Sequence, residues 1–211
     1  MKQIQLFVYI VGITIILRGG ITPELKTQFR ILFEFVIYAW SLSFVNLILC
    51  QGALNGFGIR PRTQGGLLGI LFAPFLHKDW EHLITNTAPF FILGWFVMLE
   101  GVQDFFLITA FIQLFSGLGT WLFARPYTNH IGASDIIFGY LGFLLMRSCF
   151  VGDALSVVLT VIGGFMYGRI LWGIFPIDEA ISWEGHFFGL LAGVFCAYFL
   201  DALQGVFSAT I

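Results

Sequence analysis

The chain has 211 residues, of which 58% are hydrophobic and only 10% are charged, and its formal net charge is -2. A soluble domain carries about 25% charged residues, so this composition excludes an ordinary soluble protein and predicts an integral membrane protein. The charge balance gives no indication of nucleic-acid binding, so nucleic acids are not expected partners. The three cysteines show no CxxC or Cys/His spacing, which argues against a zinc site or a disulfide framework.

Two shorter apolar runs lie toward the N-terminal side, and the second of them is too short to cross a bilayer. The first, Ile4–Leu17, predicts an extra transmembrane or interfacial helix within an N-terminal segment of residues 1–28. It could instead be a signal-peptide core, but no Ala-x-Ala pattern follows it. The second run, Leu67–Leu76, predicts a re-entrant or interfacial element packed on the remaining helices.

Six longer apolar stretches reach or approach the roughly 20 residues that a membrane-spanning helix needs. Because the stretches are continuous rather than alternating, they indicate helices and not barrel strands. The predicted fold is therefore an all-α polytopic membrane protein, with a six-helix domain over residues 29–205. The expected spans are roughly Ile31–Cys50, His82–Leu99, Phe105–Phe123, Ser134–Met146 with its neighbours, Leu155–Phe175, and His186–Leu200 with its flanks.

Polar residues at three of these span starts are candidates for a functional site. Basic residues before the first core span favour that side as cytoplasmic, and alternate spans then begin from the opposite face. His82, Ser134 and His186 begin the second, fourth and sixth spans from that face. Polar and ionisable groups at membrane depth are costly and usually mark a functional interior. These three side chains are therefore expected at one depth.

Ser134 and His186 together offer the minimum for nucleophilic acyl chemistry. Ser134 could be a helix N-cap, or a nucleophile whose oxyanion the free N–H groups of the helix start would stabilise. His186 could be a capping or interhelical histidine, or the general base for Ser134. Gly189 and Gly193 leave the face of His186 smooth, so another helix, such as the fourth span, can approach closely.

Further polar and aromatic residues surround this pair. Phe138, one turn after Ser134, could stack on the imidazole of His186. His82 and Asn86 share one helix face and could form either a polar patch between helices or an oxyanion hole. No carboxylate or cysteine is placed to complete a metal site with a histidine, so we expect neither a metal nor a cofactor.

Three motifs follow one another on three different spans: His82-x-x-x-Asn86, Gly132-x-Ser134 and His186-x-x-Gly189-x-x-x-Gly193. Together they resemble the rhomboid family of intramembrane serine proteases, of bacterial type. The similarity runs from about Ile31 to Leu200.

The resemblance implies a six-helix core with a water-filled cavity. In it Ser134 would be the nucleophile, His186 the general base and Phe138 the ring stacked on it. His82, Asn86 and the N–H of Ser134 would form the oxyanion hole. The implied partners are the lipid bilayer and transmembrane protein substrates, which would enter between the second and fifth spans. The implied location is the bacterial cell (inner) membrane, as a multi-pass protein.

One residue departs from the family pattern, which is usually Gly-x-Ser-Gly. Asp135 replaces the second glycine. An ionised acid beside the nucleophile could disfavour an oxyanion, or its side chain could point to the loop and stay solvated. An alternative function is therefore a catalytically impaired rhomboid-like protein that binds transmembrane segments. A small transporter would require paired charges at mid-membrane or an inverted repeat, and the sequence has neither.

Overall fold

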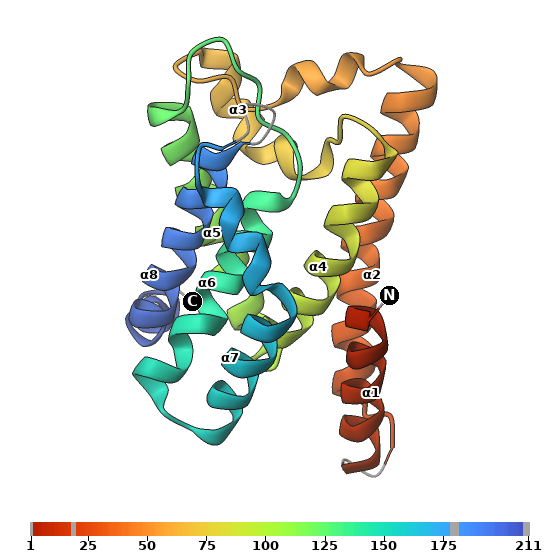
Figure 1. Ribbon diagram of the computed structural model, residues 1–211, viewed down its shortest axis with the longest axis vertical. Coiled ribbons are helices and arrows are strands. Elements are labelled where there is room, and N and C mark those ends of the chain that lie inside the picture. Colours follow the sequence, from red (N-terminus) through yellow and green to blue (C-terminus); the bar gives the residue numbers. More distant parts are fainter. Residues whose placement is uncertain (1, 18–19, 178–181, 209–211) are drawn as a thin grey trace.

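The computed structural model describes residues 2–17, 20–177 and 182–208, and over these ranges the chain is helical without a named strand. The predicted all-α fold is confirmed (Figure 1). The six long helical segments lie where the six apolar stretches predicted them. They are α2 (Pro23–Phe44) with the π-helical turn η1 (Val45–Leu49), α4 (Trp80–Met98), α5 (Val102–Phe123), α6 (Ser134–Val151), α7 (Ala154–Tyr167) with the 3-10 turn η4 (Gly168–Ile174), and α8 (Trp183–Ser208).

Five of these six segments are long and apolar enough to cross a membrane. The exception is α4, which has 19 residues but carries polar side chains in its first half, among them Glu81, His82 and Asn86. A span that lines a polar interior does not need an apolar surface all round, so its lower hydropathy reflects its place beside the site described below.

The short apolar runs also form helices, which are α1 (Lys2–Leu17) and α3 (Gln64–Phe72), the second followed by the 3-10 turn η3 (Ala73–Phe75). Helix α1 has 16 residues, lies beside one half of α2 (Figure 1), and packs the ring of Phe7 on Trp95 of α4 with centroids 5.4 Å apart. Whether residues 1–28 form a separate segment stays a prediction.

Helix α3 packs on α5, where Gln113 Nε2 donates to the Ile70 carbonyl at 2.9 Å. The element predicted between the first two spans is therefore confirmed.

Helix α6 is the centre of the bundle and contacts α4, α5, α7 and α8 (Figure 1). Its closest partner is α8, because glycines remove the side chains between the two backbones. A β-carbon on Gly189 would overlap the carbonyl oxygen of Asp135, and one on Gly193 would overlap the carbonyl oxygen of Gly139. The close approach predicted from Gly189 and Gly193 is therefore confirmed, and it brings the starts of α6 and α8 together.

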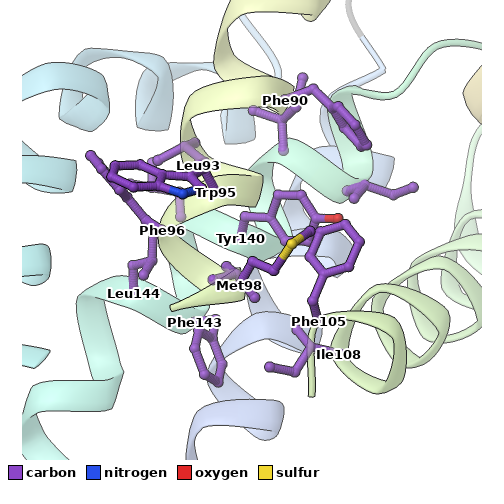
Figure 2. Packing of buried hydrophobic residues seen from close by; sticks show 14 of the residues in the cluster. Phe90, Leu93, Trp95, Phe96, Met98, Phe105, Ile108, Tyr140, Phe143 and Leu144 are labelled. Atoms are coloured by element: carbon purple, nitrogen blue, oxygen red, sulfur yellow. The ribbon is translucent and has the colours of Figure 1, made fainter. Parts of the chain in front are cut away.

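An aromatic core lies between α4, α5 and α6 (Figure 2). Trp95, Phe105, Tyr140 and Phe143 are fully buried there. The Tyr140 hydroxyl is within 2.7 Å of Thr109 Oγ1, so the polar group at this depth is paired. This packing fixes α6 against its neighbours and provides a rigid base for the side chains at the helix starts.

Candidate active site

A cavity of about 700 Å³ lies at the end of the bundle where α4, α6 and α8 begin. It collects the residues singled out above as well as polar groups from the loops. Its lining includes His82, Asn86, Ser134, Phe138, Gly173 and His186, together with Lys78, Arg125, Asn129 and His130. Because charged, amide, hydroxyl and imidazole side chains all contribute to this wall, the cavity can hold water at membrane depth.

Ser134 is the first helical residue of α6. Ala133 is the N-cap and makes no side-chain capping bond, so the N-cap alternative for Ser134 does not apply. The first intrahelical bond runs from Ile137 N–H to the Ala133 carbonyl, which leaves the N–H groups of the first turn, including that of Ser134, without an intrahelical acceptor. Ser134 thus borders the cavity next to free backbone donors.

His186 lies in the first turn of α8 and is 9% exposed. Its ring stacks on Phe138 of α6, with centroids 4.1 Å apart and planes 7° apart. Its Nδ1 lies 3.0 Å from the carbonyl oxygen of Gly173 in η4. Since a carbonyl only accepts, Nδ1 carries the proton in this bond, and Nε2 is left with a free lone pair. No hydrogen bond joins His186 to Ser134 in this state, although both side chains are among the described residues and line one cavity.

His82 and Asn86 lie on one face of α4 and border the backbone just before Ser134. The N-cap Asp79 fixes the start of this helix, since its Oδ1 accepts from His82 N–H at 2.7 Å. A β-carbon on Gly132, whose φ is +108°, would lie 2.6 Å from His82 Nε2 and 3.2 Å from Asn86 Nδ2. Within the described part of the chain, Asn86 Nδ2 and His82 Nδ1 are buried without a hydrogen-bond partner. A buried donor in this state is prepared for an acceptor that the cavity would receive.

Asp135 does not point to the loop, which was one of the two alternatives. Its carboxylate lies against the first turn of α8, where a β-carbon on Gly185 would be 2.5 Å from both carboxylate oxygens. The Ser134 side chain lies near this carboxylate.

Sequence reasoning missed several groups that hold the two helix starts together. His130 Nδ1 bonds Ser182 Oγ, directly before α8, and its Nε2 lies 2.7 Å from Thr128 Oγ1. Burial lowers the pKa of His130, which keeps the ring neutral near pH 7. Glu184 Oε1 accepts from Arg125 Nε at 2.9 Å. A pairing between residues about fifty or more positions apart leaves no local pattern. The one signal in the sequence was that His130 is one of only four histidines.

The structure thus brings all five predicted site residues into one place. Ser134, His186, His82, Asn86 and Phe138 line the same cavity from α4, α6 and α8. Their catalytic roles stay predictions. Groups of three or more metal-ligating side chains are absent from the described residues.

Comparisons with known proteins agree with this architecture. The family model described as "Rhomboid domain" matches residues 64–202. An uncharacterized protein of Mycobacterium tuberculosis is 44% identical over 162 residues, covering 73% of this chain and 68% of the relative. An uncharacterized protein of Mycobacterium leprae is 36% identical over 198 residues, covering 87% of this chain and 78% of the relative. A Bacillus subtilis protein named "Putative rhomboid protease" is 25% identical over 166 residues, covering 75% of this chain and 79% of the relative. The chain is therefore a multi-pass integral membrane protein that belongs to the rhomboid family.

Proposed function

We propose that this protein is an intramembrane serine protease that cuts transmembrane proteins with a Ser134–His186 dyad. The observation that carries the proposal is the setting of His186. Its ring is held between Phe138 and the Gly173 carbonyl, with Nε2 unprotonated, in the polar cavity that Ser134 also lines. A histidine that only joined helices would not need a free lone pair beside a cavity that a serine also borders.

In the first half of the reaction, Ser134 Oγ attacks the scissile carbonyl carbon while His186 Nε2 takes the hydroxyl proton. The carbonyl oxygen becomes an oxyanion. The imidazolium then gives its proton to the departing amine nitrogen as the C–N bond breaks, which leaves an acyl ester on Ser134. In the second half, His186 removes a proton from water, water attacks the ester, and the carboxylic product leaves as the proton returns to Ser134 Oγ.

The oxyanion would be stabilised by Asn86 Nδ2, the His82 ring and the N–H of Ser134. Asn86 Nδ2 has no partner among the described residues, so it can turn to the new charge without first breaking a bond. Preorganised donors of this kind are worth several kcal/mol in the transition state. The glycine at position 132 leaves room between these donors and the peptide backbone of a substrate.

Hydrolysis inside a membrane also requires water, and the cavity supports this part of the proposal. At about 30 Å³ per molecule, a cavity of about 700 Å³ has room for on the order of twenty waters. The substrates proposed are single transmembrane segments, because the cavity lies within the bundle and is bordered by spans and not by a soluble domain.

One observation favours a second function, a catalytically impaired protein that binds transmembrane segments. Asp135 places an acid directly after the proposed nucleophile, where the family usually has glycine, and the Ser134 side chain lies near this acid. The packing of its carboxylate against α8 favours the protease, because Asp135 is not among the residues that line the cavity.

The two functions differ in the reactivity of Ser134. Purified protein in detergent should be labelled by a fluorophosphonate probe and should cleave a model transmembrane substrate. Ser134→Ala and His186→Ala should abolish both, while Ser148→Ala, at the far end of the same helix, should leave both intact. A folded wild-type protein that neither reacts nor cleaves would support the binding function, and so would recovery of cleavage in Asp135→Gly alone. Labelling that persists in Ser134→Ala would refute the nucleophile assignment.

A further inference from the structure

The 3-10 turn that continues α7 reaches the imidazole of the proposed base. Gly173, in the turn η4, presents its carbonyl oxygen to His186 Nδ1 at 3.0 Å. In a Ser-His-Asp triad, the acid occupies this place, where it holds the ring in the tautomer with Nδ1 protonated and orients Nε2 toward the serine. Here a backbone carbonyl stands in the position of that acid.

Neither nearby carboxylate of the described chain is hydrogen-bonded to the His186 ring, whose Nδ1 pairs with the Gly173 carbonyl. The Asp135 carboxylate lies against Gly185, and Glu184 is held by Arg125 through Oε1. Among the described residues, the Gly173 carbonyl is the hydrogen-bond partner of the His186 ring. We propose that Gly173 is a positioning residue of the dyad and that its carbonyl sets the catalytic tautomer of His186. This inference rests on the proposed protease function.

The residue type at position 173 fits this role. A β-carbon there would lie 3.0 Å from Phe138 Cζ and 3.2 Å from His186 Nδ1. It would enter the narrow space where the carbonyl, the imidazole and the stacked phenyl ring meet. Gly168 begins the same turn, yet a β-carbon on it meets nothing within 4 Å. The two glycines of one short turn thus differ in their contact with the site, which provides a matched control.

The bond also links the base to the position of α7. This helix packs mainly on α6 and scarcely contacts α4, its other neighbour around the cavity (Figure 1). Much of its outer face is exposed, including Val161 and Phe165. The acceptor for His186 Nδ1 therefore comes from a turn that is continuous with α7.

The test measures the tautomer directly. The chain has four histidines, so ¹⁵N-histidine NMR in detergent micelles can be assigned with single His→Gln variants. In the wild type, His186 should show a protonated Nδ1 and an unprotonated Nε2 near pH 8. Gly173→Ala should lose this preference, and kcat should fall about 10²-fold, the low end of what general-base catalysis contributes, with KM unchanged. Gly168→Ala should retain both the tautomer and kcat.

A second variant avoids the added methyl group. Replacing Ile174 by its α-hydroxy acid turns the Gly173 carbonyl into an ester carbonyl, which is a weaker acceptor, and should lower kcat in the same direction by a smaller factor. A wild-type His186 with Nε2 protonated, or a Gly173→Ala variant that keeps the Nδ1–H tautomer and full kcat, would overturn the proposal. An inactive wild type with the Nδ1–H tautomer would instead refute the protease function, because the NMR readout does not depend on turnover.

Discussion

The contact between Asp135 and Gly185 leads to a prediction about the departure from the family pattern. Gly185→Ala adds a β-carbon 2.5 Å from both carboxylate oxygens of Asp135. Ordinary contact begins near 3.4 Å, so the carboxylate or α8 must move by about 0.9 Å, the difference between these two distances. Overpacking a well-packed interface costs about 1–3 kcal/mol. Taking about 2 kcal/mol, we expect Tm to fall by about 4–8 °C for a chain of this size.

The same substitution should be tolerated once the acid is removed. In the Asp135→Gly background the β-carbon at position 185 has no carboxylate to meet, so the double variant should regain most of the lost Tm. Gly189→Ala is the informative contrast, because its β-carbon would overlap the backbone carbonyl of Asp135. That atom remains in Asp135→Gly, so the damage from Gly189→Ala should not be rescued. Gly205→Ala, on the same helix with open space around it, controls for the change in helix propensity.

The assay is thermal unfolding in detergent followed by tryptophan fluorescence, with fluorophosphonate labelling of Ser134 as a second readout. Labelling should follow Tm, because a shift of α8 moves His186 relative to Ser134. The reasoning would be refuted if Gly185→Ala lowered Tm equally with and without Asp135. A Tm change in Gly185→Ala no larger than that in Gly205→Ala would refute it as well.

Three further predictions concern other parts of the fold. Asn86→Ala should lower kcat by about 10²-fold, as the loss of one oxyanion donor does, with Tm preserved in the same sample; unchanged cleavage would remove it from the oxyanion hole. Burial lowers the pKa of His77 from 6.5 to about 4, so the folded state keeps this ring neutral and loses about 3 kcal/mol of stability as pH falls from 6.5 to 4. His77→Gln should therefore show a smaller drop in Tm over that pH range. An identical drop would contradict the lowered pKa of His77. Phe7→Ala removes ring contacts with Phe91, Trp95 and Phe96 and should lower stability by at least about 2 kcal/mol, measured as a lower Tm. Ile13→Ala, on the exposed face of α1, should have little effect.

Much of the fold could be predicted because its determinants are local. Continuous apolar runs indicate helices whatever lies around them, and Gly189 and Gly193 mark the face on which another backbone can approach. The π-helical turn Val45–Leu49 and the 3-10 turn Gly168–Ile174 were not predicted. Both lie in apolar sequence that continues the helical pattern, so the residue types do not distinguish them from the α-helices that precede them.

The same distinction between local and non-local determinants applies to the candidate site. Side chains with reactive or donating groups were recognisable at the helix starts, where Ser134, His82 and His186 interrupt apolar sequence. The acceptor for His186 was not recognisable, because every residue carries a backbone carbonyl and Gly173 has no side chain to indicate its role. The direction of Asp135 was also left open, since a turn of 100° per residue states where a side chain leaves its own helix and not what the next helix offers it.

One physical argument explains the positions of both acids nearest the proposed dyad, Glu184 and Asp135. An unpaired carboxylate behind a buried imidazole would carry a large desolvation penalty, and this site contains none in contact with His186 Nδ1 among the described residues. Glu184 is neutralised by Arg125, and Asp135 lies against the first turn of α8, so both acids lie where they hold helix starts in place. A carbonyl dipole can select the tautomer of His186 without burying a further charge. For the proposed dyad, orientation by a neutral acceptor is therefore the arrangement that the low dielectric of a membrane favours.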